Sequence, residues 1–263
     1  MKKYAMFAYS IICYLIGFAS ILFWILSLND LIPAISIDRP VELSMPLALL
    51  KNLGLVLLFA VPHSVMARKS FKDWITKHIP KPIERSTYVL QAGLLLGLLV
   101  WQWSPLGGTI WTVTPGTPLY YSIYVMFFLG WGILFLSTFL INHFDLFGLR
   151  QTFLELQNKP YKELNFKVIS LYKYVRHPLY MGGIMGLWFT PVMSGTHLVF
   201  AISLTAYFFI GALFEERDLK KAFGEKYRAY ANKTPMMIPL TKWKNSSNTS
   251  TSLTSDQLAE QGQ

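Results

Sequence analysis

The stretch YKYVRHPLYMGG, residues 172–183, carries the side chains of this chain that are best suited to chemistry. It places Arg176 and His177 directly before Pro178, where a polar segment gives way to an apolar run. Proline is favoured in the first turn of a helix because its missing N–H would have no partner there, so we expect a helix to begin here. Two interpretations are open: a binding site at a membrane edge, or ordinary interfacial anchoring by Arg and Tyr.

A second candidate stretch, FEERDLKKAFGEKYRAY at residues 214–230, begins where another apolar run ends. Its first charged residues, Glu215 and Glu216, would be costly at a membrane edge unless they are partnered. The residues that follow suit an amphipathic helix on the membrane surface, with apolar or aromatic side chains at helical spacing at Leu219, Phe223, Tyr227 and Tyr230. The alternative is a solvated run of charges that stops transfer through the membrane.

The composition indicates the surroundings in which these two stretches work. Of the 263 residues, 53% are hydrophobic and only 14% are charged, whereas a soluble domain carries about a quarter of charged residues. The chain is therefore predicted to be an integral membrane protein. A net charge of +10 would suggest nucleic acid as the partner of a soluble protein, but here the charge is concentrated in particular loops. We interpret it as a topology signal and expect no nucleic-acid partner.

Six segments are candidate membrane spans, since a bilayer requires roughly 20 mostly apolar residues. They cover residues 5–28, 46–67, 86–103, 119–142, 178–193 and 198–214. Loop 68–85 has six Lys or Arg against two acids and segment 143–177 has six against three, whereas loop 29–45 is net negative. The positive-inside rule then predicts that both termini and the two basic segments are cytoplasmic. A five-span version with one half-buried segment leaves the basic segments on the same side.

The expected fold is an all-α integral membrane protein with five or six transmembrane helices, a C-terminal helical hairpin and a cytoplasmic amphipathic helix. Residues 1–142 would form the N-terminal membrane helices. Residues 143–240 would hold the cytoplasmic segment, the hairpin and both candidate stretches. The tail, residues 241–263, is polar and rich in Ser and Thr, so we expect it to be disordered.

A hairpin between the last two apolar segments would bring the two candidate stretches together at the cytoplasmic face. Arg176, His177 and Tyr180 would then lie near Glu215 and Glu216. Such a pocket offers acids for a cation or for ribose hydroxyls, basic groups for a carboxylate, and rings for stacking. S-adenosyl-L-methionine has all of these parts: a sulfonium, an ammonium, a carboxylate, a ribose and an adenine.

The combination of RHPLYMGG, EERDLKKAFGEKYRAY and TPMMIP resembles the C-terminal half of the isoprenylcysteine carboxyl methyltransferase and phospholipid methyltransferase superfamily, over residues 172–239. The resemblance implies a site for S-adenosyl-L-methionine that Glu216 closes, with Arg176 and Glu215 as neighbours. The residues that it implies as lining this site are Tyr172, His177, Pro178, Leu179 and Tyr180. The prenylcysteine enzymes carry an arginine four residues before the acid that matches Glu216. Here that position is Ala212, which favours a small uncharged acceptor over a carboxylate.

A wider resemblance covers most of the chain. PHSVMARKSFKDWITKHIP, TFLINHFDLFGLRQ and LYKYVRHPLYMGG are similar to the bacterial membrane methanethiol S-methyltransferases, which are related to NnrU-type proteins. This resemblance implies methyl transfer from S-adenosyl-L-methionine to methanethiol, which releases dimethyl sulfide. It also implies a bacterial cytoplasmic membrane as the location, with a small volatile thiol and the lipid bilayer as partners. No obligate protein partner is inferred.

A thiol reacts as its thiolate, so a base or a positive field should assist the reaction. In NHFD, at the end of the fourth apolar segment, His143 with Asp145 could act as an oriented base. His63 lies at the cytoplasmic end of the second segment. The alternative for all of these histidines is a structural role, hydrogen-bonded at a polar edge. They are too scattered in the sequence to predict a metal site.

Two other functions stay open on the sequence alone. The chain could methylate another acceptor, such as a phospholipid amine or another thiol, with the same cofactor site. It could also be a non-catalytic NnrU-like membrane protein that keeps the scaffold. Binding of S-adenosyl-L-methionine separates the enzymes from the non-catalytic alternative, and the resemblance favours a methyltransferase over a nicotinamide-dependent reductase.

Overall fold

The computed structural model describes residues 1–239 and residue 241. Within this part of the chain, five helices are long and apolar enough to cross a membrane. They are α1 (Lys2–Leu26), α2 (Met45–Met66), α4 (Glu84–Gln102), α5 (Pro118–Ile141) and α9 (Gly195–Lys233). The prediction of an all-α multi-pass membrane protein is thereby confirmed. The predicted disordered tail, residues 241–263, lies outside the described residues except for Thr241.

Shorter elements connect the long helices. They are η1 (Pro33–Ile35), α3 (Lys69–Ile75), η2 (Lys81–Ile83), β1 (Thr109–Thr112), α6 (His143–Leu146), α7 (Leu149–Leu156), η3 (Ser170–Lys173), α8 (Pro178–Trp188) and β2 (Val192–Ser194). Strands β1 and β2 form a small antiparallel pair. This pair joins the loop between α4 and α5 to the loop between α8 and α9.

Helix α8 is short, and an extended segment that ends in β2 continues its path. This helix has 11 residues, so it is only about 16 Å long and too short to cross a bilayer core of about 30 Å alone. Non-helical residues 189–191 continue its path to β2, and the N–H of Gly195 donates to the carbonyl of Gly108 at 3.1 Å. Residues 178–194 therefore extend from the start of α8 to the end of the bundle that carries the β pair. Five of the described helices are long enough to span, and α8 is not one of them.

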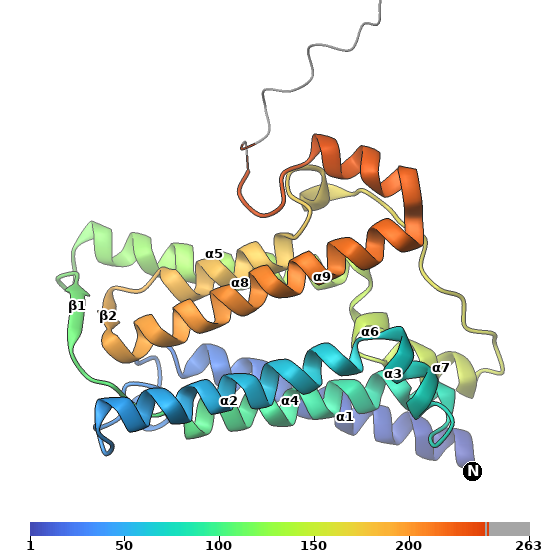
Figure 1. Ribbon diagram of the computed structural model, residues 1–263, viewed down its shortest axis with the longest axis horizontal. Coiled ribbons are helices and arrows are strands. Elements are labelled where there is room, and N and C mark those ends of the chain that lie inside the picture. Colours follow the sequence, from blue (N-terminus) through green and yellow to red (C-terminus); the bar gives the residue numbers. More distant parts are fainter. Residues whose placement is uncertain (240, 242–263) are drawn as a thin grey trace, which may run out of the picture.

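The helices form two layers (Figure 1). One layer contains α1, α2 and α4, and the other contains α5, α8 and α9. The predicted hairpin is present, because α8 packs along α9 in the second layer. The expected division at residue 142 does not separate the layers, since α5 precedes that position and packs along α8, which follows it.

Glycines allow the closest helix contacts within each layer. A Cβ atom on Gly182 of α8 would lie 2.7 Å from the backbone nitrogen of Leu134 in α5, which no real side chain tolerates. In the other layer, a Cβ on Gly93 of α4 would lie 2.7 Å from the Cα of Gly17 in α1. Small residues at membrane helix contacts let the backbones approach, and the resulting van der Waals packing replaces the hydrophobic drive that lipid cannot supply.

Buried aromatic rings join the layers at the end of the bundle that carries β1 and β2. Trp24 and Trp131 meet edge to face with centroids 4.8 Å apart, and Trp103 meets Phe200 in the same way at 4.8 Å. Edge-to-face ring pairs add to the gain from burying their area. The opposite end of the bundle, where α3, α6 and α7 lie (Figure 1), holds a cavity between the layers.

Helix α9 extends beyond the layer that it belongs to. Its residues up to Gly224 span about 45 Å at 1.5 Å per residue, more than a bilayer core of about 30 Å. Gly224 has φ 53° and ψ −131°, a conformation that favours glycine, and the chain bends sharply there. The last turns then fold back over the start of α8 (Figure 1). The predicted amphipathic helix is thus the continuation of the last span, bent at its glycine.

Candidate active site

A buried carboxylate at the bundle end joins the two candidate stretches. The Oε1 atom of Glu216 accepts from Arg176 Nε at 2.5 Å, from His177 Nε2 at 3.0 Å and from the Tyr227 hydroxyl at 2.9 Å. Glu216 is 5% exposed and His177 is 4% exposed. Because an unpaired buried charge is very unfavourable, Glu216 and Arg176 each require the other. The sequence prediction that the hairpin would bring these residues together is confirmed by these contacts.

The segment after α9 fixes the backbone of the same pair. The N–H groups of Arg176 and His177 donate to the carbonyls of Pro235 and Met236, at 2.9 and 3.0 Å. The guanidinium Nη1 of Arg176 also donates to the carbonyl of Thr234 at 2.6 Å. A cation at the C-terminal end of a helix is stabilised by the carbonyl groups that lack helical partners there. The closing TPMM sequence therefore positions Arg176 and His177 for α8 to begin directly after them.

The adjacent acid, Glu215, faces a different side of α9. Its Oε2 accepts from the Tyr180 hydroxyl at 3.0 Å and lies 3.6 Å from His177 Nδ1. Consecutive residues of a helix point about 100° apart, so the two acids approach the His177 ring at different nitrogens, Glu215 at Nδ1 and Glu216 at Nε2. The rings of His177 and Tyr180 stack with centroids 5.5 Å apart, and Tyr180 stacks in turn on Phe208 at 5.5 Å. The stack holds Tyr180 between the two helices of the hairpin.

A cavity of about 660 Å³ lies between the two helix layers at this end of the bundle. Six of the eight residues predicted for the cofactor site line it, namely Tyr172, Arg176, His177, Leu179, Tyr180 and Glu215. Of the other two, Pro178 is buried in the first turn of α8. Glu216 lies behind the wall, where it holds Arg176 and His177 in place. The structure thus brings together residues that are distant in the sequence around one space of ligand size.

The opposite wall of the cavity comes from the first layer, and only His63 among its residues was a candidate from the sequence. It contains His63 from α2, Tyr88 and Arg85 from α4, Arg68 and Lys72. His63 Nε2 lies 2.7 Å from the Tyr88 hydroxyl, and the guanidinium of Arg85 lies 4.9 Å from the centre of the Tyr88 ring. In the sequence, the basic residues of this wall indicate only topology. The one local signal for a site is the polar triplet PHS, residues 62–64, inside an apolar run.

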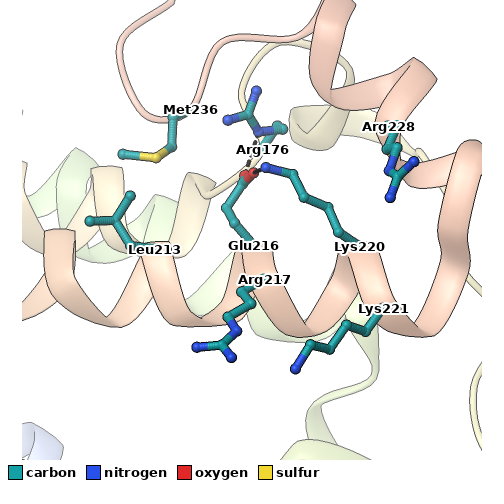
Figure 2. A pocket seen from close by; sticks show the side chains of 8 residues that line it. All are labelled: Arg176, Leu213, Glu216, Arg217, Lys220, Lys221, Arg228 and Met236. Carbon is teal, nitrogen blue, oxygen red and sulfur yellow. Dashed lines mark hydrogen bonds and ion pairs between the residues drawn. The ribbon is translucent and has the colours of Figure 1, made fainter.

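Glu216 faces a second, open pocket of about 540 Å³ on the outer side of α9. Figure 2 shows Arg176 and Lys220 pointing toward its carboxylate, and Lys220 Nζ lies 3.6 Å from Oε2. Three further cations, Arg217, Lys221 and Arg228, line this pocket with no second acid. Glu216 therefore separates a basic outer pocket from the central cavity.

The structure does not pair His143 with Asp145. His143 is buried, with Nδ1 2.8 Å from the Thr138 hydroxyl and Nε2 3.1 Å from the Tyr14 hydroxyl. Asp145 instead accepts from Arg150 at 2.7 Å. Residues two apart in a helix point to opposite sides, so the spacing in NHFD cannot orient one toward the other. Neither residue lines the central cavity. His143 is therefore not oriented by Asp145 as a general base in this structure.

Within the described part of the chain, no group of three or more His, Cys, Asp or Glu residues is placed to hold a metal ion. No family model matches the sequence, and no solved structure matches the fold. Curated proteins do match over most of their length. The chain is 46% identical to the methanethiol S-methyltransferase of Crocosphaera subtropica, over 88% of this chain and 90% of that protein.

Two further relatives agree. The chain is 47% identical to methanethiol S-methyltransferase 1 of Bradyrhizobium diazoefficiens, over 90% of this chain and 83% of the relative. It is 41% identical to the methanethiol S-methyltransferase of Mycobacterium tuberculosis, over 91% of this chain and 98% of the relative. Similarity of this extent covers both helix layers and both walls of the cavity. The chain belongs to the methanethiol S-methyltransferase family.

Proposed function

We propose that this chain transfers a methyl group from S-adenosyl-L-methionine to methanethiol and so produces dimethyl sulfide. The observation that carries this proposal is the cavity between the layers, where residues from two stretches 40 positions apart meet. The names of the three bacterial relatives support the same reaction. When bound, S-adenosyl-L-methionine supplies a methyl group activated by its positively charged sulfur.

The residues around the cavity fit this cofactor. Its volume of about 660 Å³ lies within the range of about 300–1,000 Å³ that ligand pockets occupy. Glu215 offers a carboxylate to the sulfonium or the ammonium group. The rings of Tyr172 and Tyr207 line the wall and offer faces on which an adenine can stack. Burial raises the pKa of Tyr172, and the charge of Glu215 raises it further, so its hydroxyl stays protonated and can donate.

The Glu216 network supports the site from behind. Because one carboxylate oxygen accepts three hydrogen bonds, it fixes the ring of His177 and the guanidinium of Arg176 in single orientations. Glu215 fixes the Tyr180 hydroxyl in the same way. Groups held before the ligand arrives lose little freedom on binding, which favours both affinity and the in-line geometry that methyl transfer requires.

The remaining wall of the cavity suits a small uncharged acceptor. Its apolar part includes Ile21, Phe59 and Leu96, and α9 contributes no cationic side chain to the lining. Ala212, the position at which the prenylcysteine enzymes carry an arginine, is fully buried. A carboxylate acceptor would therefore find no partner on α9, whereas a volatile thiol can enter from lipid and pack against apolar side chains.

The thiol must lose its proton for the reaction, and the His63–Tyr88 pair is our candidate acceptor. The S–H proton would pass to the Tyr88 oxygen while Tyr88 passes its own proton to His63 Nε2, 2.7 Å away. The sulfur electron pair then forms the new S–C bond as the S–C bond of the sulfonium breaks. The Arg85 guanidinium over the Tyr88 ring favours negative charge on that oxygen. His143 and Asp145 lie outside the cavity and have no part in this step.

We place the protein in the bacterial cytoplasmic membrane, with the cavity end and both termini toward the cytoplasm. The basic loop 68–85 and the basic segment 143–177 both lie at this end of the bundle (Figure 1). Positive charge is retained on the cytoplasmic side of membrane proteins, and the soluble cofactor is reached from that side. The acceptor can arrive through the bilayer itself.

The test uses membranes that contain the protein, methanethiol, and S-adenosyl-L-methionine labelled in its methyl group. We expect labelled dimethyl sulfide in the headspace, much less from Glu215→Gln, and an unchanged yield from Glu225→Gln, an exposed acid of the same helix whose side chain is 83% exposed. If the wild type binds the cofactor but yields no labelled dimethyl sulfide, the acceptor is another compound. If it binds no cofactor, the protein is not a methyltransferase.

A further inference from the structure

The central cavity carries positive charge that no salt bridge among the described residues neutralises. Four cations line it: Arg68, Lys72, Arg85 and Arg176. Arg68 pairs with Asp218 at 2.8 Å, and Arg176 pairs with Glu216 at 2.5 Å. Among the described residues, Lys72 and Arg85 form no salt bridge, and so their charges are the ones available to a ligand.

The surroundings of Lys72 and Arg85 make the absence of a salt bridge unusual. Burial lowers the pKa of Lys72, and the charge of Arg85 lowers it further. The acids that act on Lys72, namely Glu84, Glu163 and Asp218, do so from beyond salt-bridge distance. Arg85 is anchored by a bond from its Nε to the carbonyl of Leu146 at 2.8 Å, which leaves its two terminal nitrogens free of any ion pair. Two cations that line one cavity without a salt bridge favour an anionic group as the ligand there.

The two walls of the cavity differ in charge in a way that suits one part of the proposed cofactor. The wall from the second layer presents the carboxylate of Glu215, and the wall from the first layer presents Lys72 and Arg85. An amino-acid group, with its ammonium and its carboxylate, has the matching pair of charges. The adenosine part can then lie against Tyr172 and Tyr180, where the predicted motif residues are.

We propose that Lys72 and Arg85 bind the carboxylate of the methionine part of S-adenosyl-L-methionine. The cofactor would then bridge the two helix layers, rather than being held only by the C-terminal motif. This inference rests on the proposed function and adds two binding residues from the N-terminal half. An arginine and a lysine are well suited to the task, because their hydrogen bonds to a carboxylate are assisted by charge.

The test compares two ligands that differ only in this group: S-adenosyl-L-methionine and its decarboxylated form, which keeps the sulfonium and the amine. Dissociation constants are measured by calorimetry on the purified full-length protein in detergent. We expect the wild type to bind the intact cofactor about 10- to 100-fold more tightly, as for a hydrogen bond to a charged group. Lys72→Met and Arg85→Met should each lose much of this preference while binding the decarboxylated ligand as the wild type does.

Three further variants sharpen the comparison. Lys77→Met removes an exposed cation that follows α3 and does not line the cavity, so it should keep the full preference. Lys72→Arg and Arg85→Lys retain the positive charge and should keep most of the preference for the intact cofactor. The proposal is overturned if Lys72→Met and Arg85→Met keep the preference of the wild type, or if they weaken both ligands equally. A wild type that binds neither ligand would instead refute the proposed function, and this inference with it.

Discussion

Replacing Glu216 by alanine should destabilise the protein far more than a change at the neighbouring acid. The carboxylate is 5% exposed, and one of its oxygens accepts hydrogen bonds from Arg176, His177 and Tyr227. Its removal leaves the Arg176 guanidinium buried without a counter-charge. Breaking a buried ion pair from one side costs about 3–5 kcal/mol. For a chain of this size, that corresponds to a fall in Tm of about 6–20 °C.

The assay is thermal unfolding in detergent, followed by tryptophan fluorescence without any ligand, so that the result does not depend on the proposed reaction. Glu215→Gln is the matched control, because its side chain is 47% exposed and it occupies the adjacent position. Substitutions at such exposed positions change stability by about 0.5 kcal/mol or less. We therefore expect Glu215→Gln to unfold close to the wild-type temperature.

A double-mutant cycle separates the ion pair from other effects of the substitution. Glu216→Met and Arg176→Met should each be strongly destabilising, whereas the double variant should lose less than their sum, by about 1–3 kcal/mol. Replacing both charges leaves no unpaired group behind, which is why the sum overestimates the loss. If Glu216→Ala unfolds no earlier than Glu215→Gln, or if the two substitutions are additive, the carboxylate does not hold the two stretches together.

Three other predictions test different parts of the structure. His63→Gln should reduce the rate of dimethyl sulfide formation about 10²–10⁴-fold without changing the affinity for the cofactor. His78→Gln, at an exposed position, should change neither the rate nor the affinity. If His63→Gln keeps the wild-type rate, His63 is not the base. Gly182→Leu should lower the free energy of unfolding by about 1–3 kcal/mol, because α5 and α8 would be forced apart. Gly132→Leu should be tolerated, because there is open space around its Cβ position. Equal losses in the two variants would contradict the close contact of α8 with α5 at Gly182. Burial lowers the pKa of His143, so the unfolded chain binds more protons than the folded one. The contribution of His143 to stability is therefore present above about pH 6.5 and lost as the pH falls below it. The Tm of the wild type should fall more steeply on acidification than the Tm of His143→Gln, and parallel curves of Tm against pH would contradict this prediction.

Several features were determined by the sequence alone, because they depend on local composition. An apolar run long enough to span a bilayer has one stable conformation there, a helix, since all of its backbone groups must be paired internally. The long spans therefore appear where the hydrophobic runs predict them. Pro178 marks the start of α8. The kink at Gly224 was not predicted, because the helical spacing of apolar residues continues across it. The hairpin that unites Arg176, His177 and Glu216 follows from the short connection between the last two segments.

Other features were decided only by the tertiary structure, because they join segments that share no local pattern. Helical spacing shows that Glu215 and Glu216 point in different directions, but only the packing of the C-terminal segment decides that Glu216 is buried and Glu215 faces the cavity. The same holds for His63 and Tyr88, whose contact depends on how α2 packs on α4. Lys72 in α3 and Arg85 in α4 fall within residues 68–85, whose charges indicate only topology in the sequence. Their place in the wall of a cavity appears only when the two layers are brought face to face, because the second layer supplies the other wall.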